Sequence, residues 1–457
     1  MSDASTSATV VTGAELAALH AEQLAVFERA RPRSKALSER ARTHLPGGVP
    51  MSWMVKWPGS FPVFVERAEG AHFTCVDGID HVDLCLGDTG AMSGHSPAAA
   101  VEAVRRQASR GITTMLPCED AIVAAEELSR RFGVSHWQFT LTATDANRHV
   151  LRYARHLTGR RKVVVIDYCY HGTVDETFAV LGPDGTTIAR RGSIGPAVDV
   201  AETTVVVPFN DLAAMERALA GGDVAAVLME PAMTNIGIVL PEDGYHAGVR
   251  ELTRRHGALL VMDETHTLCA GPGGCTRAWG LDPDVVVVGK TIGSGVPAAA
   301  FGLGADLAAR IGAEIDLEDV DLGGVGGTLA GNALSMAAVR ATLTEVLTDD
   351  VFVHTAALAQ RWAEGVASVV AERGLPWHVT VLGSRAEYAF SPLPPRTGAQ
   401  AAAADDFALQ QYLHLQALNE SVLLTPFHNM ALFCPDARVE DVDQHTRAFA
   451  AAAAALT

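Results

Sequence analysis

Two short runs of sequence decide the fold of this chain: ALLVMDE at residues 258–264 and VVVVGKTIGSG at residues 285–295. Each run starts with consecutive apolar residues and then changes abruptly to charged or glycine-rich positions. Short continuous runs of valine, leucine and isoleucine are typical of strands that are buried on both faces of a parallel sheet. Because ligands bind beyond the carboxyl ends of such strands, we expect the chemistry at Asp263 and Lys290.

Similar apolar runs and amphipathic patterns alternate on the N-terminal side of this pair. Further strands are predicted at 137–142, 162–167 and 224–229. Helices are predicted at 146–157, 211–219 and 245–256. Alternating strands and helices favour right-handed crossover connections, which place helices on both faces of the sheet. The sequence therefore predicts an α/β fold with a mostly parallel central sheet.

The two ends of the chain have a different character. Residues 1–12 are small and polar and predict a mobile tail, whereas helices are predicted at 13–31 and 38–45. The segment 13–80 is expected to contribute to a small domain, 81–335 to form the large ligand-binding domain, and 336–457 to form the C-terminal small domain.

The C-terminal part combines helical and strand patterns, which predicts an α+β domain built from both ends of the chain. Helices are predicted at 335–347 and 351–373, and short strands at 378–382 and 386–390. The alanine-rich stretch 398–404 is interpreted as a loop, and 450–455 as a helical tail.

Composition excludes several classes of protein. The chain has 457 residues, of which 48% are apolar and 19% charged, so disorder is excluded for most of its length. Its formal charge of −18 argues against a broad nucleic-acid or membrane surface. The seven cysteines form no Cys-x-x-Cys pair, which predicts reduced thiols and no metal site. With no targeting or membrane-spanning pattern, we expect a cytoplasmic protein.

One interpretation of the two runs is nucleotide hydrolysis, with 258–264 as a Walker B strand and 289–291 as the end of a P-loop. A P-loop requires glycine five positions before Gly289, where Asp284 stands, and the P-loop would also follow the acidic strand instead of preceding it. We reject this interpretation.

A Schiff-base enzyme accounts for the strand ends better. Partial burial of Lys290 before a glycine-rich turn favours a nucleophilic amine. An aspartate at the neighbouring strand end can pair with a protonated ring nitrogen, and a threonine-rich turn that opens a helix can bind a phosphate. With an aromatic side chain stacked on the ring, these features together indicate pyridoxal 5'-phosphate (PLP).

At this point the chain resembles the class III (omega-type) aminotransferases of PLP fold type I, and among them the glutamate-1-semialdehyde aminomutase-like branch. The matching motifs occur in order over residues 35–450. They are LSERA at 37–41, LPGGV at 45–49, YHG at 170–172, DE at 263–264, GKTIGSGVP at 289–297 and GTLAGN at 327–332.

The resemblance implies a role for each matching residue. Lys290 would form the Schiff base with PLP, and Asp263 would hold the ring N–H. Tyr170 and Thr265 would pack on the two faces of the ring, with Tyr170 counted among the catalytic residues. The remaining implied cofactor contacts are Thr142, Ala143 and Thr144 around the phosphate, Glu230 with Asn235 near the ring, and Thr328 on the phosphate of a neighbouring subunit. The resemblance thereby implies a homodimer with shared active sites.

The chain also departs from the family pattern. The phosphate turn reads Thr-Ala-Thr-Asp at 142–145 instead of Ser-Gly-Thr-Glu. No arginine occurs at 51–56, where the aminomutase-like branch reads a substrate carboxylate, and lysine does not replace the guanidinium fork. Trp53, Lys56 and Arg385 are the candidates for the substrate pocket.

We predict a PLP-dependent aminotransferase that moves an amino group between an amine or amino acid donor and a carbonyl acceptor. The same residues can support an aminomutase of the glutamate-1-semialdehyde type, a racemase or epimerase, or a decarboxylase. A non-enzymatic binding module is the alternative outside enzymology. The expected partners are small-molecule substrates and a second copy of the chain.

Overall fold

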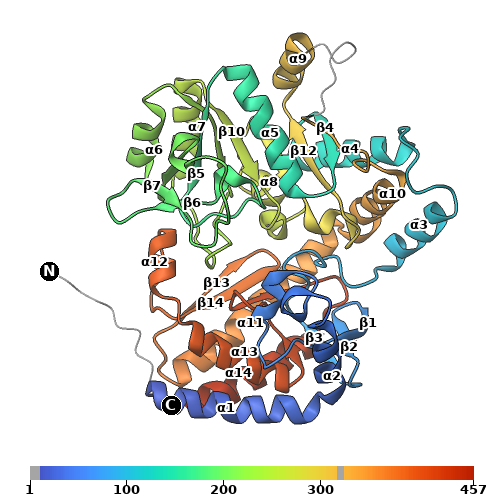
Figure 1. The fold of residues 1–457 in the computed structure, drawn as a ribbon, viewed down its shortest axis with the longest axis vertical. Helices are drawn as coiled ribbons and strands as arrows, with labels where there is room; N and C mark the ends of the chain where they lie inside the picture. The colour runs from blue at the N-terminus through green and yellow to red at the C-terminus, as the bar shows by residue number, and fades with distance from the viewer. Residues whose placement is uncertain (1–10, 316–323) are drawn as a thin grey trace. The chain divides into compact units, whose positions relative to one another are not determined.

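The computed structural model describes residues 11–315 and 324–457. The chain divides into two compact units (Figure 1). The large unit comprises Ala98–Phe352 and Pro395–Ala402, and the small unit comprises the chain up to Pro97 together with Val353–Pro394 and Ala403–Thr457. These divisions fall later in the chain than the predicted boundaries at 80 and 335. The predicted tail, 1–12, lies outside the described residues except for its last two positions.

A seven-stranded sheet forms the centre of the large unit, in the order β4-β12-β11-β10-β9-β5-β8. The strands are β4 (His136–Thr140), β5 (Lys162–Ile166), β8 (Thr204–Val207), β9 (Val224–Met229), β10 (Leu259–Asp263), β11 (Val285–Val288) and β12 (Ala299–Leu303). From β11 to β8 all neighbours are parallel, and β12 is antiparallel to both β11 and β4. The predicted α/β fold with a mostly parallel sheet is confirmed.

The central strands of this sheet are apolar and lie in the interior of the large unit. Every residue of β9 and β11 is buried, which explains why these strands read as uninterrupted apolar runs in the sequence. Helix α5 (Ala143–Thr158) packs on β9 and β12, α6 (Leu212–Leu219) on β8, and α7 (Tyr245–His256) on β10. The predicted helices therefore cover the sheet and bury its apolar side chains.

The remaining elements of the large unit are shorter or lie outside the central sheet. They are α3 (Ala98–Ala108), α4 (Glu119–Phe132), α8 (Gly274–Ala278), α9 (Ala305–Glu314), α10 (Ala333–Ala341), the hairpin β6 (Ala179–Leu181) and β7 (Thr187–Ala189), and α12 (Gly398–Ala403), which runs one residue past the unit.

The small unit contains two sheets and a group of helices. One sheet has the order β1-β2-β3-β15 and the other β13-β14-β16. The strands are β1 (Val65–Glu69), β2 (His72–Cys75), β3 (Asp80–Asp83), β13 (His378–Leu382), β14 (Arg385–Ala389), β15 (Val422–Leu423) and β16 (Met430–Leu432). The helices are α1 (Gly13–Ala30), α2 (Pro32–Ala41), α11 (Asp349–Glu372), α13 (Phe407–Asn419) and α14 (Val439–Leu456), and the first four residues of α11 lie in the large unit. Because β15 pairs with β3, the two ends of the chain share one sheet, as the α+β prediction requires.

Three local predictions were wrong. The second helix spans Pro32–Ala41 instead of 38–45, because proline fits the first helical position, where no N–H partner is needed. The stretch predicted as a loop at 398–404 forms α12 over Gly398–Ala403, since alanine is the best helix former. The helix predicted at 335–347 ends at Ala341 and continues as a π-helical turn over Thr342–Val346.

The helices in the described part of the chain are each too short or too polar to cross a membrane.

Candidate active site

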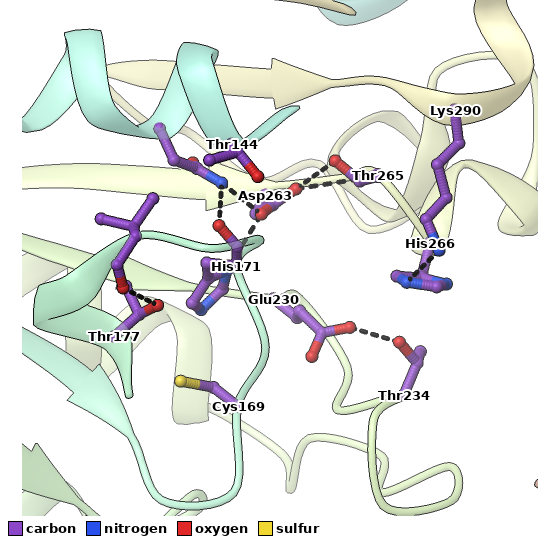
Figure 2. Close-up of polar contacts among 12 residues, drawn as sticks. Thr144, Cys169, His171, Thr177, Glu230, Thr234, Asp263, Thr265, His266 and Lys290 are labelled. Atoms are coloured by element: carbon purple, nitrogen blue, oxygen red, sulfur yellow. Dashed lines mark hydrogen bonds and ion pairs between the residues drawn. The ribbon is translucent and has the colours of Figure 1, made fainter. Parts of the chain in front are cut away.

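Two adjacent strand ends carry the central pair of residues. Asp263 is the last residue of β10, and Lys290 opens the 3-10 turn Lys290–Gly293 that follows β11. The strands are parallel with Asp263 opposite Val287, so both side chains arise at the same edge of the sheet (Figure 2). Lys290 has a φ of +53°, a left-handed conformation that is strained for a residue other than glycine. Such strain is typical of functional positions.

The carboxylate of Asp263 is buried and held on both oxygens. Oδ2 accepts from His171 Nδ1 and from Asn147 Nδ2, each at 2.9 Å. Oδ1 accepts from the Thr265 backbone N–H at 3.1 Å and from the Thr265 hydroxyl at 2.5 Å. These contacts fix the carboxylate in one orientation at the strand end, and Figure 2 shows His171 and Thr265 approaching it from different segments.

The electrostatics of this cluster keep Asp263 ionised. Burial opposes ionisation, but the hydrogen bond and charge of His171, helped by Thr265 and Asn147, lower the pKa of Asp263 to about 2. Burial also disfavours the His171 imidazolium, yet the neighbouring Cys169 and the Asp263 carboxylate raise the pKa of His171 well above its usual range. These pKa shifts favour the charged form of both groups, and Asp263 can accept an N–H from a cation.

Lys290 meets a histidine from the neighbouring strand end. Its Nζ lies 2.9 Å from His266 Nε2, and both side chains are half-buried. Figure 2 shows the lysine side chain running toward the His266 ring.

The sequence contains only four lysines. Lys35 and Lys162 pair with Glu28 and Asp223, and the Lys56 ammonium lies over the ring of Phe427.

The N-terminus of α5 supplies an anion site of the predicted type. Thr142 caps the helix, accepting from the Asp145 backbone N–H at 3.2 Å, and Ala143 opens the first turn. The first-turn N–H groups of a helix lack intrahelical partners and attract phosphate. Thr144 Oγ1 accepts from the Thr173 N–H at 3.0 Å, which ties the segment after β5 to this turn. A Cβ at Gly172 would lie 2.1 Å from that hydroxyl, so only glycine permits this approach.

Tyr170 and Glu230 lie at two further strand ends. Tyr170 is 38% exposed and packs edge-on against Phe178, with ring centroids 6.2 Å apart. Glu230 directly follows β9, is buried, and accepts a hydrogen bond from the Thr234 hydroxyl. Asn235 donates to the Tyr168 carbonyl at 2.9 Å. The contacts of these residues with a cofactor stay predictions.

The three substrate-pocket candidates belong to the small unit. Trp53 is 41% exposed and packs on Phe427 at 5.9 Å, and Lys56 Nζ lies 5.1 Å from the centre of the same ring. Arg385 is buried in β14 and donates to Glu387 at 3.1 Å. Arg385 therefore has a structural partner, and its contact with a substrate stays a prediction.

Three residues at this edge were not assigned roles from the sequence. His171 was noted only within the YHG motif, and Asn147 and His266 were not singled out at all. Asn147 reaches Asp263 from α5, so only the tertiary fold brings these residues together. A signal for His266 was present, since an ionisable residue in the turn after Asp263 is placed at the ligand edge of the sheet.

The donor set fits PLP. A buried carboxylate held in its charged form suits a protonated ring nitrogen, a half-buried lysine suits the aldehyde, and the N-terminus of the 16-residue helix α5 suits the phosphate. Within the described ranges, 11–315 and 324–457, no group of three or more His, Cys, Asp or Glu side chains is arranged to hold a metal ion.

Comparisons with known proteins point to the same chemistry. The family profile "Aminotransferase class-III" matches residues 54–391. The glutamate-1-semialdehyde 2,1-aminomutase of Anaeromyxobacter dehalogenans strain 2CP-1 is 34% identical over 413 residues, which cover 89% of this chain and 94% of that protein.

Solved structures extend the similarity to the whole fold. A variant of a glutamate-1-semialdehyde-aminomutase from Pseudomonas aeruginosa PAO1, in complex with PMP, is 47% identical with a TM-score of 0.96, covering 98% of this chain and 100% of that one. An omega-transaminase from Sphaerobacter thermophilus is 29% identical with a TM-score of 0.84, covering 93% and 98%.

Proposed function

This chain belongs to the class-III aminotransferase family of PLP enzymes, and we propose that it acts as an aminomutase, moving an amino group between neighbouring carbons of one small molecule. The observation that carries the proposal is the nearly full-length similarity to proteins named as aminomutases, in sequence and in fold. The predicted aminotransferase reaction takes second place for this reason.

When bound, PLP supplies an electron sink for a carbanion next to the amine nitrogen. The chain supplies the rest. Asp263, ionised and oriented by His171 and Asn147, would hold the ring N–H. The first turn of α5 would hold the phosphate, with Thr142 and Thr144 beside it. Lys290 would be the attachment point for the cofactor aldehyde.

Lys290 also moves the proton. An aminomutase removes a proton from one carbon and returns a proton to its neighbour, and one mobile amine at the strand edge can reach both positions. The four-carbon side chain gives Nζ this range, whereas Asp263 stays fixed by its hydrogen bonds. The division into one fixed charge and one mobile amine suits proton transfer within a single molecule.

Intermolecular amino transfer is the second candidate, and residues 51–56 favour it. This segment lacks the arginine that would read the carboxylate of glutamate-1-semialdehyde, and Lys56 cannot form a bidentate pair. The substrate would then differ from the one in the relatives' names.

We propose that the active form is a homodimer. Thr328 is exposed, as is Leu329 beside it. Met115 and Leu116 are 80% and 72% exposed, and Ile112, whose carbonyl accepts from Leu334 N–H, is 50% exposed. Large apolar side chains gathered in neighbouring segments are typical of a surface covered by a second subunit.

The deciding experiment uses the purified holoenzyme with glutamate-1-semialdehyde and no other carbonyl compound. An aminomutase converts many equivalents into an isomer of the same mass, detected by NMR and mass spectrometry. If no more than one equivalent per active site reacts until a 2-oxo acid is added, the aminotransferase assignment replaces this one. If the semialdehyde does not react under either condition, the substrate assignment fails, and a screen of other amino aldehydes and ketones follows.

A further inference from the structure

His266 lies in a turn whose position is fixed on both sides. The preceding residue, Thr265, is bonded to Asp263 through its N–H and its hydroxyl. The following residue, Thr267, donates its hydroxyl to Glu264 at 2.5 Å. His266 is therefore carried by a segment in which each neighbour is tied to a buried carboxylate.

Glu264 anchors this turn to the rest of the large unit. It is fully buried and accepts from the N–H groups of Cys275 at 3.1 Å and Thr276 at 2.5 Å. A Cβ at Gly274 would lie 2.3 Å from Glu264 Oε2, so this approach requires glycine. The anchoring leaves the His266 side chain as the half-buried group of the turn, directed at Lys290 (Figure 2).

A hydrogen bond of 2.9 Å joins Lys290 Nζ and His266 Nε2. When Nζ is the donor, the imidazole nitrogen is the acceptor and the ring carries its own proton on Nδ1. Two positive charges at this separation would repel each other.

We propose that His266 is a positioning residue for Lys290: its Nε2 accepts from Nζ and holds the amine at the strand edge where the cofactor and substrate bind. This inference rests on the proposed function, because it assigns to His266 the orientation of the lysine that the reaction uses. A long side chain whose amine starts each step at this edge loses less freedom when it reaches the reacting carbons.

The test compares two substitutions with a matched control. His266→Leu removes the acceptor at similar size, and His266→Gln keeps an acceptor oxygen. His136→Leu is the control, since His136 is an exposed histidine at the start of β4 in the same unit. Cofactor-free protein is mixed with PLP and quenched with borohydride at intervals, and the cofactor fixed on the Lys290 peptide is measured by mass spectrometry.

We expect His266→Leu to slow cofactor attachment at Lys290 by roughly two- to tenfold, the effect of one hydrogen bond. His266→Gln should remain within about twofold of the wild type and His136→Leu should match it, with unchanged melting temperatures in the cofactor-free proteins. In turnover, kcat should fall in His266→Leu while KM stays constant.

Two results would overturn the inference: wild-type attachment in His266→Leu, or equal slowing in His266→Leu and His266→Gln, which would indicate a structural role. Failure of the proposed function looks different, because the wild-type protein would then still attach the cofactor at Lys290 but would not isomerise glutamate-1-semialdehyde.

Discussion

The strand edge around Asp263 and the segment around Trp53 are built in different ways. At the strand edge, buried hydrogen bonds from three other residues fix a charged group, and a parallel sheet with fully buried strands carries it. The segment Ser52–Lys56 is an exposed 3-10 turn whose contacts are aromatic packing and a cation over a ring. Changes at the strand edge disturb a whole network, whereas the exposed turn can change its side chains at little cost. The strand edge is therefore the more constrained of the two regions, and the part that the exposed turn plays in substrate choice stays a prediction.

The largest expected effect lies at the strand edge. Lys290→Ala should lower kcat by at least roughly 10⁴-fold, because the chain loses both its attachment point and its proton carrier. Steady-state assays at saturating PLP measure the loss. Lys162→Ala, which removes a lysine paired with Asp223 in the same unit, is the control and should keep wild-type activity. Comparable losses in both variants would show that the strand edge has no special role.

Asp263→Asn tests the fixed charge of the network. The amide keeps the shape but cannot hold a protonated ring nitrogen as an ionic partner, so kcat should fall by roughly 10² to 10³-fold. Asp282→Asn, at an exposed surface pair with Arg254, should leave kcat unchanged. Near-wild-type turnover in Asp263→Asn would show that the negative charge of Asp263 is not needed for catalysis.

These strand-edge residues could be predicted from the sequence because the strands that carry them could be predicted. The runs at 224–229 and 285–288 were predicted with their observed bounds, since a strand buried on both faces needs uninterrupted apolar residues. Asn147 and His171 were not predicted as partners of Asp263, because hydrogen bonds between segments so far apart in sequence depend on the tertiary fold. The second helix was misplaced because Pro32 was taken to end a helix, although it also begins one.

The free energy of unfolding should depend on pH through the buried pair of Asp263 and His171. The stability contributed by the lowered pKa of Asp263 is present above the unfolded value of about 4 and is lost as the pH falls toward 2. The contribution of His171, whose pKa is raised, is present below about 6.5 and is lost as the pH rises through its folded value.

Both contributions are therefore complete between about pH 4 and pH 6.5. In this window Asp263→Asn should lower the free energy of unfolding of the cofactor-free protein by about 2 kcal/mol, and by less at pH 2.5. Urea denaturation followed by circular dichroism measures the difference. A penalty that does not change with pH would exclude the buried ion pair.

The smallest effect is expected in the exposed turn. Lys56→Ala should raise KM for a carboxylate substrate by roughly two- to fivefold, because an exposed point charge contributes little, and kcat should stay within about twofold. Lys35→Ala, a surface lysine paired with Glu28, is the control and should change neither constant. A loss in kcat as large as that of Asp263→Asn would show that the exposed turn matters as much for catalysis as the strand edge.

Peptide mapping after borohydride treatment of the holoenzyme tests directly whether PLP is bound covalently to Lys290. The sequence offers only four lysines, 35, 56, 162 and 290, so each can be followed in one mass-spectrometric experiment. We expect the reduced cofactor on the peptide that contains Lys290 and on no other. Cofactor on the peptide of Lys35, Lys56 or Lys162, or on none of the four, would contradict it.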